Sequence, residues 1–170
     1  SIYDQCKKRT IVANGFSKAF AMTGWRLGTV IAPEDVAEKF ALMLETTSSC
    51  VPPFIQRAGI EAAIGDQAGT KTMMKEYAKR RDIIVDGLNS IKNITCVKPG
   101  GAFYVFPNIT QTGLSSETFA ELALDKAGVA LLPGTNFGIN GEGYIRLCYA
   151  NSVQNIERGI DRLKKMVESL

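Results

Sequence analysis

Two basic residues stand eight positions apart in an apolar, glycine-rich stretch, NGFSKAFAMTGWRLG, at residues 14–28. Lys18 has aromatic and other apolar neighbours, and if these fold over it, desolvation lowers the pKa of its amine. A neutral amine can attack a carbonyl carbon. Arg26 could grip a phosphate through two parallel charged hydrogen bonds. An amine nucleophile beside a phosphate clamp suggests a phosphorylated aldehyde, and pyridoxal 5′-phosphate is the obvious candidate.

A second arginine, Arg146, lies within the apolar segment YIRLCYANS at residues 144–152. On an extended strand Arg146 and Cys148 point to one face, and the apolar residues between and beside them point to the other. A charge in such a strand lies either at a sheet edge in solvent or opposite a carboxylate. Taken alone, the segment favours the sheet edge.

The elements that must position these residues follow from the pattern of apolar residues. The lysine segment lies between two β-branched apolar runs, residues 10–13 and 27–32, which predict a strand, a loop and a second strand. Helices and strands alternate after residue 33, so a layered sheet-and-helix architecture is expected. Five further helices are predicted. The first begins at Pro33 and is broken by residues 46–53, and the others span 54–65, about 70–91, 115–128, and Asn151 or Ser152 to the end. The further predicted strands are two around a turn within 94–109, one in 129–134 and one in 143–150.

Composition and charge exclude several classes of function. The chain has 170 residues, a net charge of +3 and scattered basic residues, which is too weak a basic pattern for a nucleic-acid partner. Its apolar runs are shorter than the roughly 18 residues of a membrane helix, and no export signal opens the chain. Four singly spaced cysteines and no histidine favour reduced thiols over disulfides or a metal site. We therefore expect a cytoplasmic protein whose proton carrier, if it is an enzyme, is not histidine.

NGFSKAFAMTGWRLG resembles the cofactor-lysine segment of the class I/II pyridoxal-phosphate aminotransferases, the aspartate aminotransferase group. Other segments are similar to that family's motifs, appear in the family's order and together cover nearly all of the chain. These are YAKRRDIIVDGL for the long interdomain helix, KPGGAFYVFPNI for the P-x-G-A-F-Y turn, LLPGTNFG for the P-G-x-x-F-G loop and YIRLCYANS for the R-L-x-x-A-x-S strand.

The resemblance implies roles for individual residues. Lys18 aligns with the lysine that forms a Schiff base with pyridoxal phosphate and then shuttles the proton. Arg26 aligns with the arginine that binds the cofactor phosphate, and Arg146 with the arginine that holds the substrate α-carboxylate. Many family members carry a further phosphate ligand three positions before the lysine, where this chain has Gly15. Ser17, directly before the lysine, is the candidate to replace that ligand.

The resemblance also implies the fold and the domain organisation. It implies an α/β fold, the C-terminal part of a pyridoxal-phosphate-dependent transferase. Residues 1–75 would be a remnant of the large cofactor-binding domain. Residues 76–170 would form the small domain, a sheet packed with helices in an α+β arrangement. We expect the small domain to support itself, and the front portion to be poorly supported or to borrow contacts from another copy.

The implied activity belongs to the parent protein. It is expected to be a homodimer that moves an amino group from an L-amino acid to a 2-oxo acid, with aspartate the donor by family majority. Because only 17 residues precede Lys18, the segments that hold the cofactor ring are expected to be missing, and the chain alone inactive. A lyase of the same fold and a non-catalytic binding or dimerising module are the alternatives. The segment MTGWR favours the transaminase over the lyase.

Overall fold

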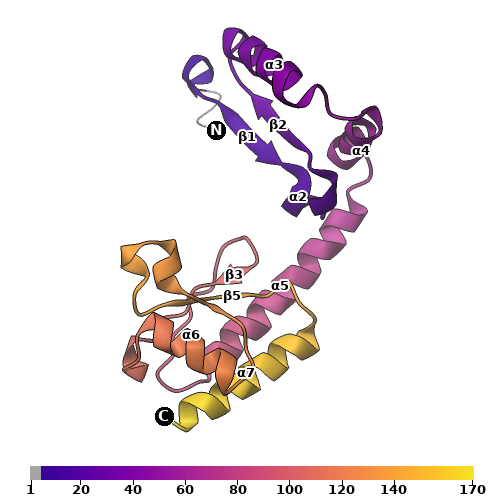
Figure 1. The fold of residues 1–170 in the computed structure, drawn as a ribbon. Helices are drawn as coiled ribbons and strands as arrows, with labels where there is room; N and C mark the ends of the chain where they lie inside the picture. Colours follow the sequence, from indigo (N-terminus) through magenta and orange to yellow (C-terminus); the bar gives the residue numbers. More distant parts are fainter. Residues whose placement is uncertain (1–4) are drawn as a thin grey trace. The chain divides into compact units, whose positions relative to one another are not determined.

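The chain divides into two compact units between Thr72 and Met73 (Figure 1). This computed structural model describes residues 5–170, so the first four residues of the predicted large-domain remnant lie outside the described part. We call residues 5–72 the first unit and residues 73–170 the second unit. Helix α5 (Ala68–Asn89) is continuous across their boundary. No helix within residues 5–170 is long and apolar enough to cross a bilayer.

The first unit contains a β-hairpin, which confirms the predicted strand, loop and second strand. Strand β1 (Val12–Gly15) pairs antiparallel with β2 (Gly28–Ile31), in a register that sets Gly15 opposite Gly28. The connection contains α2 (Phe16–Ala19) and the 3-10 helix η2 (Thr23–Trp25). The other elements of this unit are η1 (Lys7–Arg9), α3 (Glu34–Ser48) and α4 (Pro53–Ile64).

The first unit buries little apolar surface. Among the hydrophobic side chains that the structure describes here, Phe16 and Met22 are the buried ones. Helix α4 packs on the hairpin through Gly59, where an added Cβ would meet the Leu27 side chain. The large apolar side chains of α3 are largely uncovered. The exposed large hydrophobic residues of this unit are Ile11, Trp25, Val30, Ile31, Phe40, Leu42, Met43, Leu44, Phe54, Ile60 and Ile64.

A small antiparallel sheet organises the second unit. Its order is β3-β5-β4, so β5 (Ile145–Cys148) lies between β3 (Tyr104–Val105) and β4 (Leu132–Pro133). The expectation that Arg146 lies at a sheet edge is therefore wrong, because β5 is the central strand. Helices α6 (Ser116–Asp125) and α7 (Val153–Glu168) complete the predicted sheet packed with helices.

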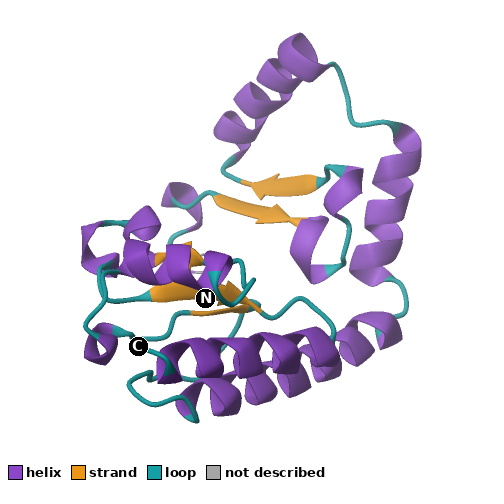
Figure 2. Cartoon of the chain, turned by 60° about the horizontal axis from the view of Figure 1, so that its bottom comes forward, coloured by secondary structure: helices purple, strands orange, loops and turns teal. Residues whose placement is uncertain are grey.

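The C-terminal half of α5 lies beside α7 (Figure 2). The two helices approach closely at Gly87, where an added Cβ would collide with the Ile160 side chain. The buried side chains of α5 lie at its C-terminal end, whereas Met74 is 64% exposed. The core of this unit consists of Ile84, Val85, Leu88, Ile91, Ile94, Cys96, Val105, Ile109, Phe119, Ala123, Ala127, Ile145, Tyr149, Ile156, Ile160, Leu163, Met166 and Val167.

Two helices of this unit begin at serine caps. The hydroxyl oxygen of Ser115 accepts a hydrogen bond from the backbone N–H of Thr118, and that of Ser152 accepts one from Asn155. Short 3-10 helices fill the connections between the other elements. They are η3 (Thr110–Thr112), η4 (Gly134–Phe137) and η5 (Ile139–Gly141).

One predicted strand does not form as a strand. The segment before the Pro99 turn pairs with the segment after it only through a single bridge, Thr95 to Asn108. Its backbone is held instead by the Asn89 side chain, which donates to the Cys96 carbonyl oxygen at 3.0 Å and accepts from the Cys96 N–H at 2.8 Å. A side-chain amide at the end of α5 thus takes the place of a neighbouring strand.

Candidate functional site

The end of the hairpin carries three of the four predicted site residues. Helix α2 begins directly after β1 and contains both Ser17 and Lys18. The N–H of Phe16 donates to the Leu27 carbonyl oxygen at 3.1 Å, which continues the hairpin pairing one step beyond the strands. Arg26 directly precedes that partner in the chain. The hairpin therefore brings Ser17, Lys18 and Arg26 to one place.

Lys18 is exposed. Desolvation of Lys18 was conditional on its apolar neighbours folding over it, and in the described residues they leave it exposed. Met22 is buried and turned into the unit, whereas Trp25 is 42% exposed. Phe20 is half-buried and packs against Phe16, with ring centroids 5.2 Å apart. The apolar side chains of this segment stabilise the hairpin end and leave the lysine in contact with water.

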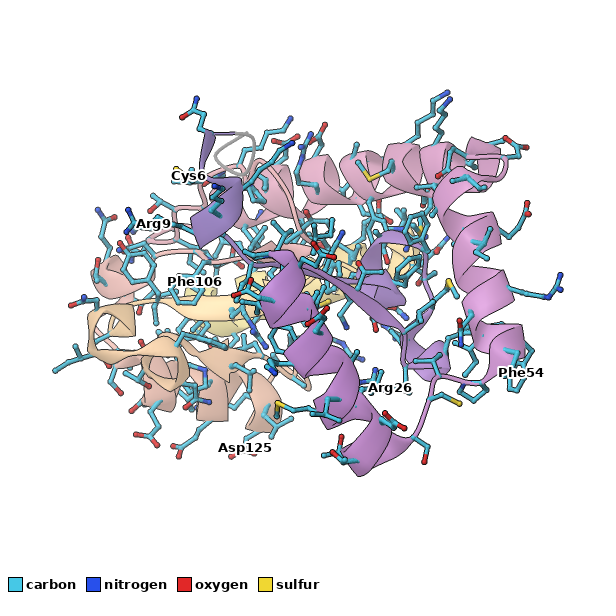
Figure 3. The ribbon with its side chains drawn as sticks, turned by 90° about the horizontal axis from the view of Figure 1, so that it is seen from above. Cys6, Arg9, Arg26, Phe54, Phe106 and Asp125 are labelled. Atoms are coloured by element: carbon cyan, nitrogen blue, oxygen red, sulfur yellow. The ribbon has the colours of Figure 1, made fainter. Side chains whose placement is uncertain are left out.

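Arg26 follows η2 in a left-handed backbone conformation, with φ 53° and ψ 44° (labelled in Figure 3). Its guanidinium is exposed, and Nη1 donates to the Thr23 carbonyl oxygen at 3.1 Å. That bond folds the side chain back over its own turn and uses one of the five N–H donors of an arginine. The other donors are available to an anion.

These residues fit the phosphorylated aldehyde predicted from the sequence. A primary amine at Lys18, a guanidinium at Arg26 and a hydroxyl at Ser17 could provide one nucleophile and two kinds of phosphate ligand. At Gly15, just before the lysine helix, an added Cβ would meet nothing within 4 Å, so a ligand has open access to the backbone. Within residues 5–170, no group of histidine, cysteine or acidic side chains is arranged to hold a metal ion.

Arg146, the fourth predicted residue, lies in the second unit and is half-buried on β5. It faces neither solvent at a sheet edge nor a carboxylate. Its Cζ lies 4.4 Å from the ring centroid of Tyr104 and 4.1 Å from that of Phe137. Cation–π contacts of this kind stabilise a partly desolvated guanidinium.

Sequence reasoning missed both rings. Tyr104 and Phe137 each lie in a segment similar to a family motif, but 42 and 9 residues respectively separate them from Arg146 along the chain. Strand pairing provides the link, since Tyr104 pairs with Cys148 across β3 and β5. A period-two pattern shows which residues share a face, but not which strands are neighbours.

The comparisons with known proteins agree with these features. The family model for aminotransferase class I and II matches residues 3–163. Aspartate aminotransferase from Pyrococcus horikoshii is 46% identical over 163 residues, which is 95% of this chain and 42% of that protein. Aromatic-amino-acid aminotransferase 2 from Thermococcus litoralis is 44% identical, with the same two coverages.

Solved structures show the same likeness. The aromatic aminotransferase from Pyrococcus horikoshii superposes with a TM-score of 0.91 at 42% identity, covering 96% of this chain and 44% of that one. The aspartate aminotransferase from Rhizobium meliloti gives a TM-score of 0.90 at 31% identity, covering 95% of this chain and 42% of that one. The chain thus spans less than half the length of these relatives. It belongs to the class I and II aminotransferase family.

Proposed function

We propose that the protein containing this chain is a pyridoxal-phosphate-dependent aminotransferase that moves an amino group from an L-amino acid to a 2-oxo acid. The observation that carries the proposal is the placement of an exposed lysine, Lys18, beside an exposed arginine, Arg26, at one hairpin end in a chain of this family. Fold membership alone would not support an activity, because related scaffolds host different chemistries.

The residues at the hairpin end have different roles in this proposal. Pyridoxal phosphate, when bound, supplies an electrophilic aldehyde and a ring that withdraws electrons. Lys18 would hold the aldehyde group of the cofactor through its Nζ atom, and the same amine would carry the proton that the reaction moves. The guanidinium of Arg26 and the hydroxyl of Ser17 hold the phosphate. With no histidine in the chain, the lysine is the residue of this site suited to proton transfer.

Arg146 binds the α-carboxylate of the substrate. Its fork of N–H donors matches a carboxylate through two parallel bonds and so orients the bond to be broken. The relatives are named for aspartate and for aromatic amino acids, and both kinds of substrate carry this same α-carboxylate. We propose aspartate as the donor, to be tested against an aromatic amino acid in the longer protein.

We further propose that the whole protein is a cytoplasmic homodimer. The four cysteines are free, which fits a reducing compartment. The first unit exposes more than ten large hydrophobic side chains among its described residues, and a second copy could cover part of that surface. Light scattering coupled to size-exclusion chromatography of the longer protein measures its mass and tests the dimer.

Borohydride trapping in the longer protein tests the role of the lysine. We expect incubation of that protein with pyridoxal phosphate and then borohydride to give a stable adduct, which peptide mass spectrometry locates at Lys18. Lys18→Ala should lose that adduct, whereas Lys39→Ala, which removes another exposed lysine, should keep it. Adduct spread evenly over the surface lysines would favour the non-catalytic module.

Turnover separates the whole protein from this chain. We expect the 170-residue chain alone to convert no amino acid, because it spans 42% of an aminotransferase such as that of Pyrococcus horikoshii. In the longer protein, appearance of a new amino acid from the 2-oxo acid identifies transamination, and release of ammonia identifies a lyase. Turnover by the isolated chain that Lys18→Ala abolishes would contradict the expectation.

A further inference from the structure

The two rings that contact Arg146 come from the two sides of its strand. Tyr104 lies on β3, and Phe137 ends η4, which directly follows β4. Since β5 lies between β3 and β4, the guanidinium receives one ring from each neighbouring element. The distances of 4.4 and 4.1 Å from Cζ to the ring centroids are well within the range of favourable cation–π contacts.

These contacts hold the guanidinium without using its hydrogen-bond donors. Within the described residues, the structure gives the guanidinium of Arg146 no hydrogen bond and no ion pair. A ring attracts the cation through its face and accepts none of the in-plane N–H bonds that a carboxylate would take. The side chain is therefore fixed in place while its N–H groups stay open to a ligand.

The Phe137 ring is itself held by neighbours. Phe106, labelled in Figure 3, lies edge-on to Phe137 at 6.0 Å between ring centroids and stacks on Tyr144 at 5.4 Å. Helix η4 begins at Gly134, whose α-carbon lies so close to Gly141 that a Cβ on either residue would collide with the carbonyl oxygen of the other. The close contact between Gly134 and Gly141 and the ring contacts of Phe106 therefore fix the position of Phe137.

We propose that Tyr104 and Phe137 are positioning residues, which set the orientation in which Arg146 meets the substrate carboxylate. The inference rests on the proposed function, because it assumes that Arg146 binds a carboxylate. Loss of either ring leaves the charge in place but lets the guanidinium sample more orientations, so more entropy is lost on binding. We expect carboxylate binding to weaken roughly 3- to 10-fold for each ring removed.

The test uses the 170-residue chain, 2-oxoglutarate as the probe, and the NMR signal of the Arg146 Nε–H, assigned by its loss in Arg146→Lys. In the unsubstituted chain we expect this signal to lie upfield because of ring currents and to move on titration. Tyr104→Leu and Phe137→Leu should each reduce the upfield shift and raise the dissociation constant. Ile139→Ala, in an exposed neighbouring turn, is the matched control and should change neither.

Variants that keep a ring separate positioning from packing. Tyr104→Phe and Phe137→Tyr should retain both the upfield shift and the affinity. Pentafluorophenylalanine at position 137 keeps the shape of the ring but reverses its quadrupole, so it should weaken binding even in a chain with an unchanged amide spectrum. This substitution tests the positioning role even if a leucine variant fails to fold.

The outcomes distinguish the two proposals. If the leucine and pentafluorophenylalanine variants bind 2-oxoglutarate as tightly as the unsubstituted chain, the positioning role is wrong and the carboxylate role of Arg146 stands. If the unsubstituted chain and Arg146→Lys bind the probe equally, or neither binds it, the carboxylate role fails and the positioning role fails with it.

Discussion

Ser116 is a fully buried polar residue that joins two distant parts of the second unit. Its hydroxyl oxygen accepts hydrogen bonds from the backbone N–H groups of Gly143 at 2.8 Å and Tyr144 at 3.2 Å. The start of α6 is thereby tied to the segment that leads into β5. A single hydroxyl thus positions the strand that carries Arg146.

Ser116→Ala should lower the free energy of unfolding by about 1–3 kcal/mol, because it leaves these backbone N–H groups without their partner. Urea denaturation followed by circular dichroism measures the change. Ser169→Ala is the control, since the hydroxyl of Ser169 makes a single bond near the end of the chain, to the Met166 carbonyl. Equal losses in the two variants would show that the buried hydroxyl has no special role.

Cys96 should react much more slowly than the other cysteines. Burial raises the pKa of the Cys96 thiol to about 11, because a thiolate is poorly solvated there. Cys6, Cys50 and Cys148 are exposed, whereas Cys96 is 7% exposed. Iodoacetamide at pH 8 followed by peptide mass spectrometry should label the three exposed thiols first. Early labelling of Cys96 in the native chain would contradict its burial.

The same raised pKa predicts how stability changes with pH. An unfolded thiol loses its proton near pH 8.5, whereas the folded Cys96 keeps its proton until about 11. Its contribution to stability is therefore fully present below about pH 8.5 and is lost as the pH rises through about 11. Cys96→Ala should flatten this decline in urea titrations at several pH values. Cys148→Ala, the control, should leave the decline as it is.

At the scale of elements, local signals predicted most of the fold. The hairpin, the five longer helices and the two serine caps need only short-range pattern, such as alternating apolar residues or a hydroxyl before a helix. The neighbours of β5 could not be predicted, because strand order depends on Leu132 pairing with Arg146 and Tyr104 pairing with Cys148, and these partners lie far apart in sequence. The aromatic setting of Arg146 was missed for the same reason.

The predicted strand before the Pro99 turn does not form, and the local cause is one that the apolar pattern does not show. The Asn89 side chain provides both a donor and an acceptor to the Cys96 backbone. The backbone of this segment therefore forms hydrogen bonds without pairing to a neighbouring strand along its length. Side-chain amides compete with secondary structure in this way.

Asn89→Ala should therefore release the segment from α5 and lower the free energy of unfolding by about 1–3 kcal/mol. Chemical denaturation measures the loss, and hydrogen exchange at the Cys96 amide should accelerate. Asn155→Ala is the control, because the side-chain amide of Asn155 makes exposed bonds to Asn151 and Arg158. An unchanged rate of hydrogen exchange at the Cys96 amide in Asn89→Ala would show that the Asn89 side chain does not hold this segment.

At the scale of the whole molecule, the two units differ in how they are stabilised. The second unit has a continuous core in which α5, the sheet, α6 and α7 all take part. The described part of the first unit buries Phe16 and Met22. Because apolar burial is the main favourable term in folding, the units should differ in stability.

We expect residues 68–170, which include all of α5, to unfold cooperatively on their own, and residues 5–67 to lack a cooperative transition. Circular dichroism of the two separate pieces in urea provides the measurement. In the complete chain, hydrogen exchange should be fast at β1 and β2 and slow at β5 and α7. Equal protection from hydrogen exchange in the two units would contradict the expected difference in their stability.

The uncovered hairpin of the first unit also affects the behaviour of the chain at high concentration. Val30 and Ile31 lie exposed on β2, and among residues 5–170 each strand of this two-stranded sheet has a partner on one side only. An open strand edge with exposed apolar side chains invites edge-to-edge pairing between molecules. We expect turbidity to rise with protein concentration. Val30→Lys, which introduces a charge of the kind that protects natural sheet edges, should suppress that turbidity and leave the second unit intact.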